Sequence, residues 1–159
     1  MLVLVTYFSS TGNTKLLAES VAKGVEKEGV ECVLKPVQQV TEEDFLSANG
    51  IIAGSPSYFG SMAAEMKNLF DRMVGLRRRM EGKVGAAFST SGDPSGGKET
   101  TMLSIIQAMM IYGMIIVGDP MEAGGHYGVS CQGRPGKEDL EKAEALGRRV
   151  AKLVKKLYG

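Results

Sequence analysis

The stretch that decides the fold is Leu2-Val3-Leu4-Val5-Thr6-Tyr7-Phe8-Ser9-Ser10-Thr11-Gly12-Asn13-Thr14. Its first part, Leu2 to Phe8, is an apolar run rich in β-branched residues, which predicts a buried strand. From Lys15 onward apolar residues recur at helical spacing, which predicts a helix. The segment Ser9 to Thr14 therefore joins the strand to the N-terminus of this helix. The free backbone N–H groups and the positive dipole end of such a helix favour an anion.

The hydroxyl-rich loop favours a phosphate monoester held by neutral groups. A nucleoside-triphosphate loop requires G-x-x-x-x-G-K-[ST], and this loop lacks that order. The dinucleotide fingerprint G-x-G-x-x-G occurs nowhere in the chain. The alternative is an ordinary hydroxyl-rich helix N-cap that binds no ligand. The candidate phosphate ligands are Ser9, Ser10, Thr11, Gly12, Asn13 and Thr14.

Length, composition and charge narrow the class of protein. The 159 residues fit one domain spanning 1–159, with 43% hydrophobic and 23% charged residues as in soluble globular proteins. Nineteen basic and 18 acidic residues give a net charge of +1, which argues against nucleic-acid binding. The basic run Arg77 to Arg79 is expected to be a solvated helix end, with attraction of an anionic partner as the alternative.

The cysteines and the hydropathy pattern indicate the cellular compartment in which we expect the protein. Cys32 and Cys131 match no metal or redox spacing, so we expect no metal site and two free thiols in a reducing compartment. No apolar run reaches the length of a membrane span, and the apolar start lacks the basic segment of a signal peptide. These observations favour a cytoplasmic protein without a membrane partner.

Strand and helix patterns alternate along the chain and predict an α/β fold. The expected strands are apolar on both faces, as in a doubly wound, five-stranded parallel sheet with helices on both faces. Thr41 to Asp44 forms a predicted capping box that opens a short helix. The expected strands are 2–8, 30–34, 51–54, 83–88 and 114–117, and the longer helices begin at 15 and span 62–74, 98–112 and 137–157.

The loops after the third and fourth strands share polar and glycine-rich sequence. In doubly wound sheets a ligand binds beyond the carboxyl ends of the strands, where these loops lie. Tyr58 and Phe59 are adjacent, so one ring is expected to face the cleft and lie against a flat conjugated ligand, unless it folds back onto the next helix. Thr90 and Ser91 add hydroxyls, and the alternative for their loop is a flexible surface turn.

The only histidine, His126, lies in the glycine-rich segment Gly124 to Gly128. We expect this segment to follow the fifth strand, at the same sheet edge as the other loops. His126 is then either a polar donor beside a ring-shaped ligand or a structural residue, and the sequence leaves both open.

A phosphate site, a planar ring site and no dinucleotide fingerprint together point to flavin mononucleotide (FMN). With these features the chain resembles the flavodoxin-like superfamily over essentially its whole length. Within it, residues 54–62 followed by residues 89–92 are most similar to the NAD(P)H:quinone oxidoreductases of the tryptophan-repressor-binding-protein type. The resemblance implies the strand order 2-1-3-4-5 and phosphate binding by Ser9 to Thr14. It also implies ring or ribityl contacts from Pro56, Ser57, Tyr58, Phe59, Gly60, Thr90, Ser91, Gly92, Asp93, Gly96, Gly97 and His126.

The implied activity is FMN-dependent transfer of electrons from NADH or NADPH, a transient substrate, to a quinone or similar acceptor. Tyr58 and His126 are the expected catalytic residues, because they could position the second substrate. The alternative is a flavodoxin-type electron carrier between protein partners, although such carriers are usually acidic and this chain is nearly neutral. A homo-oligomer, dimer or tetramer, is left open.

Overall fold

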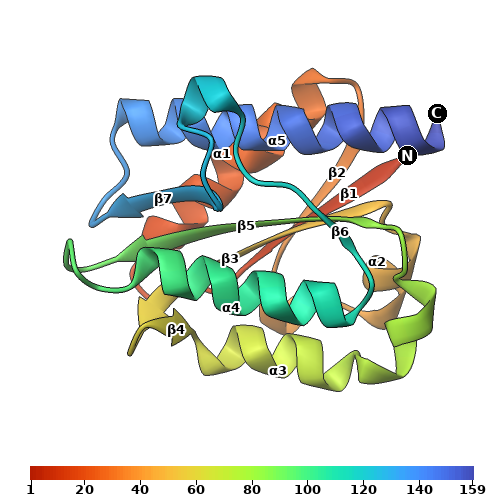
Figure 1. Ribbon diagram of the computed structural model, residues 1–159, viewed down its shortest axis with the longest axis horizontal. Coiled ribbons are helices and arrows are strands. Elements are labelled where there is room, and N and C mark those ends of the chain that lie inside the picture. The colour runs from red at the N-terminus through yellow and green to blue at the C-terminus, as the bar shows by residue number, and fades with distance from the viewer.

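A computed structural model describes all residues, 1–159, and contains a mainly parallel sheet between two layers of helices (Figure 1). The central strands run in the order β2-β1-β3-β5, and two short strands, β6 and β7, both pair with the outer side of β5. A further short strand, β4, is antiparallel to β3. The strands are β1 (Leu2–Tyr7), β2 (Glu31–Pro36), β3 (Gly50–Tyr58), β4 (Ser61–Met62), β5 (Val84–Ser91), β6 (Ile115–Ile116) and β7 (Gly128–Gln132).

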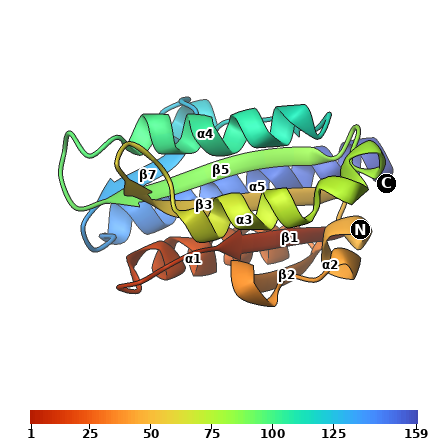
Figure 2. The same cartoon turned by 90° about the horizontal axis from the view of Figure 1, so that it is seen from below.

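Helices cover both faces of the sheet (Figure 2). One face packs against α1 (Asn13–Lys27) and α5 (Lys137–Tyr158). The other packs against α2 (Glu42–Ser47), α3 (Ala64–Arg72) and α4 (Lys98–Ile111). Three short 3-10 helices complete the chain: η1 (Val37–Gln39), η2 (Val74–Arg79) and η3 (Met121–Ala123). None of the helices combines the length and apolarity needed to cross a bilayer.

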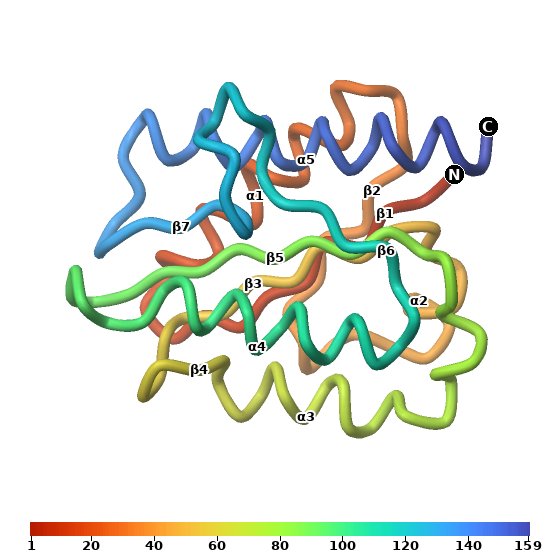
Figure 3. The backbone as a smooth tube through the Cα atoms, viewed as in Figure 1, coloured from red at the N-terminus to blue at the C-terminus, as the bar shows by residue number.

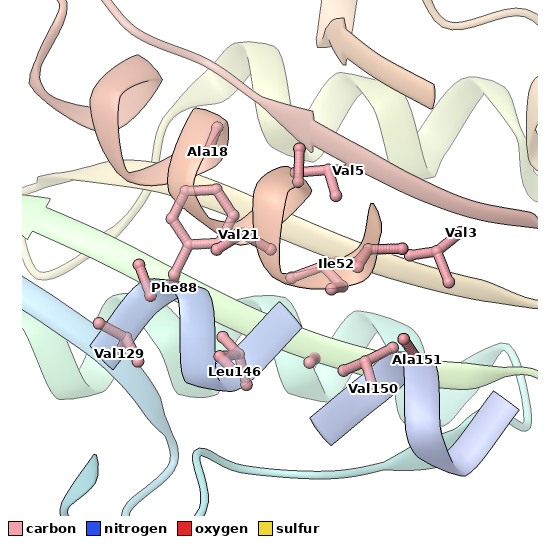
Figure 4. Packing of buried hydrophobic residues seen from close by; sticks show 14 of the residues in the cluster. Val3, Val5, Ala18, Val21, Ile52, Phe88, Val129, Leu146, Val150 and Ala151 are labelled. Carbon is pink, nitrogen blue, oxygen red and sulfur yellow. The ribbon is translucent and has the colours of Figure 1, made fainter. Parts of the chain in front are cut away.

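Strand β1 shows why the sheet is buried on both sides. Successive side chains of a strand point to opposite faces, so Val3 and Val5 join the core under α1 and α5, whereas Leu4 joins the core under α2, α3 and α4. Figure 4 shows the first of these cores, where Val3 and Val5 lie with Val21, Ile52 and Phe88 between the sheet and the helices. The predicted doubly wound α/β fold is confirmed.

The fifth strand differs from the prediction. The residues expected to form it, 114–117, provide only β6, and its longer part is β7, which pairs with the second half of β5. The chain leaves the sheet between them at Gly118-Asp119-Pro120, where proline has no N–H to donate. The expectation that Gly124 to Gly128 follows the carboxyl end of the fifth strand was therefore wrong, because this segment leads into β7.

Strands β3 and β5 run further than their apolar residues predicted. Parallel pairing continues through Ser55 with Ser89 and Pro56 with Thr90, so residues expected in loops belong to strands. Met62, expected to be helical, lies in β4. The predicted capping box is confirmed: Thr41 Oγ1 accepts from the Asp44 N–H at 3.2 Å, and the Asp44 carboxylate accepts from the Thr41 N–H at 2.8 Å.

Gly54 tests how tightly β3 and β5 pack. A Cβ atom at this position would lie 2.0 Å from Cε2 of the Phe88 ring, which is fully buried. We expect Gly54→Ala to lower the free energy of unfolding by about 1–3 kcal/mol, because the ring must move within a filled core. Gly75→Ala is the control, since a Cβ there meets nothing within 4 Å. Urea unfolding of both variants checks this, and equal stabilities would contradict it.

Candidate functional site

The loops after β1, β3 and β5 gather at the carboxyl edge of the sheet, on the left of Figure 3. The first of them leads into α1, which begins at Asn13 after Gly12. Gly12 has φ 92°, a left-handed conformation that glycine adopts without strain. No side chain caps this helix, and its first turn contains no acidic residue. Its first N–H groups and its dipole are therefore free to receive an anion.

The hydroxyl groups around this helix end are left with protons to donate. Ser9 Oγ accepts from the Gly12 N–H at 3.0 Å, which leaves its own proton free. Thr14 Oγ1 and Thr90 Oγ1 are 2.9 Å apart and buried, so their bond uses one proton and leaves the other without an acceptor. Ser10 Oγ and the Tyr58 hydroxyl are 2.8 Å apart and exposed, and their bond likewise uses one of their two protons. A ligand rich in acceptor oxygens fits such a set of donors.

The loop after β3 is a tight hairpin that leads into β4. Tyr58 pairs with Ser61, and the turn between them consists of Phe59 at φ 51° and Gly60 at φ 74°. A left-handed conformation costs a bulky residue roughly 1 kcal/mol. The Phe59 side chain nevertheless packs against nothing and is fully exposed. Strain and exposure of an aromatic residue at one position indicate a binding surface rather than a folding requirement.

The loop after β5 approaches this hairpin closely. A Cβ atom at Gly97, which has φ 83°, would lie 2.7 Å from Cα of Gly60, so only glycine fits between the two loops. Gly97 precedes α4, whose N-terminus also has no side-chain cap. Asp93 closes its own loop, because its carboxylate accepts from the Ser95 N–H at 2.8 Å and its carbonyl oxygen from Ser91 Oγ at 2.7 Å. Its charge is thus engaged within the loop.

Two buried residues that the sequence did not single out support these loops. Thr101, inside α4, donates its hydroxyl proton to Ser57 Oγ at 2.8 Å and leaves the Ser57 proton free. Ser55 Oγ accepts from the Ala63 N–H at 2.8 Å and ties the hairpin to the start of α3. Neither could be found from the sequence, because one lies in a regular helix pattern and the other was assigned to a loop.

His126 is not at the carboxyl edge. It lies in the connection between β6 and β7, where its backbone N–H donates to the Asp119 carboxylate at 2.7 Å, and no hydrogen bond joins it to the three loops. Asp119 is buried and also accepts from the Gly125 N–H, so it is the organising residue that sequence reasoning missed. His126 lines a hollow of about 260 Å³ together with Asp119, Lys142 and Glu99, which lies in the first turn of α4.

Cys131, at the end of β7, is buried beside the site. Burial raises the pKa of its thiol to about 11, and the nearby Asp139 adds to the rise. The thiol therefore stays protonated near neutral pH and is a poor nucleophile. Burial likewise raises the pKa of the Cys32 thiol to about 12.

The geometry thus brings the three loops together through the Ser10–Tyr58 and Thr14–Thr90 bonds and the Gly60–Gly97 contact, whereas His126 lies in the β6–β7 connection. It offers an anion site made of neutral donors and, beside it, an exposed aromatic hairpin in contact with a glycine loop. Its one acidic residue, Asp93, is already bonded, and it contains no histidine or lysine. Such a site can bind and orient a phosphate-bearing aromatic ligand, and it contains no strong acid or base of its own.

Comparison with known proteins agrees with this geometry. Residues 35–127 match the family described as NADPH-dependent FMN reductase. A protein of Archaeoglobus fulgidus named NAD(P)H dehydrogenase (quinone) is 38% identical, with 98% of each chain covered. A protein of Aquifex aeolicus named flavodoxin is 41% identical, covering 96% of this chain and 86% of its own.

Solved structures show the same fold over nearly the whole chain. One described as a flavodoxin, WrbA-like protein, from Agrobacterium tumefaciens has a TM-score of 0.85 at 25% identity, with 98% of both chains covered. A flavodoxin from the domain Archaea has a TM-score of 0.82 at 28% identity, with 98% of this chain covered and 99% of its own. The resemblance read from the sequence motifs is confirmed.

Thr11, exposed in the first loop, tests the anion site. We expect Thr11→Asp to weaken FMN binding at least about tenfold, because a carboxylate beside the phosphate adds repulsion between like charges. Thr11→Asn, which has nearly the same shape but no charge, is the matched control and should bind almost as the wild type. Titration of flavin fluorescence measures both affinities. Unchanged affinity of the charged variant would show that the phosphate lies elsewhere.

Proposed function

Because the chain belongs to the NADPH-dependent FMN reductase family, we propose that it is an FMN-dependent oxidoreductase that passes electrons from NAD(P)H to a quinone or similar acceptor. The observation that carries the proposal is the adjacency of the uncapped α1 N-terminus to the hairpin of Tyr58 and Phe59, joined by the Ser10–Tyr58 hydrogen bond. This adjacency suits a ligand with a phosphate at one end and a flat ring at the other.

The residues present fit FMN. The first-turn amides of α1 and the free protons of the Ser9, Ser10 and Thr14 group would hold the phosphate, and the neutral donors suit its acceptor oxygens. Tyr58, Phe59 and the loop that ends at Gly97 would flank the ring. The two loops meet closely at Gly60 and Gly97, where a Cβ atom at Gly97 would lie 2.7 Å from Cα of Gly60.

FMN, when bound, would supply the redox chemistry, which is hydride acceptance from NAD(P)H and delivery of two electrons to the acceptor. In the overall reaction NAD(P)H and one proton reduce the quinone to a hydroquinone. The chain's own residues bind and orient, since the loops contain no strong acid or base. Both substrates then use the same exposed edge in turn, which predicts ping-pong kinetics.

The second candidate is an electron carrier, and the 41% identity to a protein named flavodoxin favours it. Charge argues against it, because a carrier that docks on basic partners gains from strong negative charge and this chain has a net charge of +1. The carrier would exchange electrons with proteins and react slowly with NAD(P)H.

A spectroscopic experiment separates the two candidates. The purified protein, loaded with FMN, is expected to lose its yellow colour within seconds of anaerobic NAD(P)H addition and to regain it when a quinone is added, because both react at the exposed ring edge. Slow bleaching by NAD(P)H would favour the carrier. A colourless protein that also fails to take up FMN would reject both.

Tyr58 and His126 remain our proposed positioning residues for the second substrate. Tyr58 lies at the site edge, exposed and bonded to Ser10, whereas His126 lies in the β6–β7 connection. We expect Tyr58→Ala to lower kcat/KM for the quinone by about tenfold and His126→Ala by less, each with a smaller effect on FMN affinity. Steady-state kinetics and flavin titration check this. Unchanged rates and affinity in His126→Ala would show that this histidine is structural.

A further inference from the structure

A fourth loop reaches the carboxyl edge of the sheet, beside the three loops of the candidate site. It consists of residues 133–136, and we call it the β7–α5 loop after the elements that it connects. Strand β7 is parallel to β5, and Ser91 pairs with Gln132 at the end of both strands. The β7–α5 loop therefore starts next to the loop after β5, on the left of Figure 3.

The backbone of the β7–α5 loop is held on both sides of Arg134. On one side the Gly133 N–H donates to the Ser91 carbonyl oxygen at 2.7 Å, which ties the loop to the end of β5. On the other side Pro135 is buried, and its ring fixes the backbone angle φ. The Arg134 side chain itself is exposed. The fold thus fixes where this residue stands and leaves its guanidinium open to solvent.

A second cation, Lys98, lies close to the β7–α5 loop. It is the first residue of α4 and directly follows Gly97, which contacts the β3–β4 hairpin. Burial raises the pKa of the Cys131 thiol, and the charge of Lys98 is near enough to offset part of that rise. The Cys131 sulfur in turn lies 3.7 Å from the Gly133 carbonyl oxygen. Lys98 and the β7–α5 loop therefore flank the same end of β7.

Neither of these two cations is paired with an acid. The Nζ of Lys98, which is partly exposed, and the guanidinium of Arg134 make no salt bridge and no hydrogen bond in the structure. Asp93 and Asp139, the acids beside the two loops, already accept backbone N–H groups. Glu99 follows Lys98 directly, but adjacent residues of a helix do not face each other. Two positive charges are thus available to an anion at this edge.

We propose that Lys98 and Arg134 bind the phosphate groups of the nicotinamide dinucleotide and are specificity-determining residues for the electron donor. This rests on the proposed function, in which NAD(P)H reduces bound FMN. The nicotinamide must then lie against the flavin ring, between the hairpin and the loop that ends at Gly97, and the rest of the dinucleotide extends over a neighbouring loop. Strand β7 lies on the side of β5 opposite β3 and β1, so its loop is away from the α1 N-terminus that would hold the FMN phosphate.

Repulsion between anions gives the two cations a role. The FMN phosphate and the dinucleotide phosphates are all negatively charged, so they repel each other when both molecules are bound. The loop Ser9 to Thr14 contains no cation that could offset this repulsion. Lys98 and Arg134 offset it on the side where the dinucleotide leaves the flavin ring, and they can donate charge-assisted hydrogen bonds to its phosphate oxygens.

Calorimetric titration of the oxidised, FMN-loaded protein with NAD⁺ and NADP⁺ tests the proposal without turnover. We expect Arg134→Gln and Lys98→Gln each to raise the Kd of the dinucleotide about threefold to tenfold, because each removes one charge that meets a phosphate. Arg134→Lys keeps the charge and should stay closer to the wild type. Arg79→Gln is the matched control, because Arg79 is also exposed but lies in η2, before the amino end of β5, and its variant should bind as the wild type does.

Salt provides a second measurement that a merely structural role would not change. The Kd of the wild type should rise with ionic strength, and those of the two glutamine variants should rise less, because salt screens the interaction that they lack. A weaker affinity of these variants for both dinucleotides assigns the cations to the pyrophosphate, and a weaker affinity for NADP⁺ alone assigns them to its 2′-phosphate. Either result supports the proposal.

Three results would overturn the proposal. The first is equal affinity of the wild type and both glutamine variants for both dinucleotides. The second is a loss of FMN affinity, measured by flavin fluorescence, as large as the loss of dinucleotide affinity, because the cations would then serve the FMN phosphate. The third is an equal loss in Arg79→Gln. A wild type that NAD(P)H does not bleach rejects the proposed function and this proposal with it, whereas a bleached wild type with unchanged variants rejects this proposal alone.

Discussion

The parallel pairing of β1, β3 and β5 is the constraint on which the rest of the structure depends. Parallel strands end at the same edge, so the loops that follow them are brought together whatever their separation in the sequence. The pairing of Pro56 with Thr90 keeps β3 and β5 side by side up to the carboxyl edge and brings the hairpin and the Gly97 loop into contact. If either strand ended with its apolar residues, the loops would start earlier along the strands, and the buried hydrogen bond between Thr14 and Thr90 would not form.

The sequence predicted most of the fold because the fold rests on local patterns. The apolar strands, the amphipathic helices and the Thr41 capping box each have their own periodicity or spacing. It did not predict the divided fifth strand, because β6 contains only Ile115 and Ile116 and β7 is five residues long with two apolar side chains, Val129 and Cys131. Membership of β7 in the sheet depends on its contact with β5, which is distant in the sequence.

The candidate site shows the same division between local and distant information. The residues of the three loops could be named from the sequence, because hydroxyls and glycines followed each predicted strand. Their pairing could not: the bonds of Ser10 to Tyr58 and Thr101 to Ser57 join residues 48 and 44 positions apart. The position predicted for His126 was wrong because its segment was expected to follow the carboxyl end of the fifth strand, whereas it precedes β7. The Gly118-Asp119-Pro120 turn was the sequence signal that this strand is interrupted.

Four of the five α-helices of this protein begin in one of two ways, and the difference locates the ligand. At α2 and α5 a carboxylate, from Asp44 or Asp139, accepts a backbone N–H and neutralises the positive end of the dipole. At α1 and α4 a left-handed glycine precedes the helix and no side chain intervenes. Unsatisfied N–H groups cost stability, so the two helices that border the cofactor loops are stabilised fully only when something else accepts those bonds. A phosphate and a polar ring edge are acceptors of that kind, so ligand binding and local stability are coupled at this edge of the sheet.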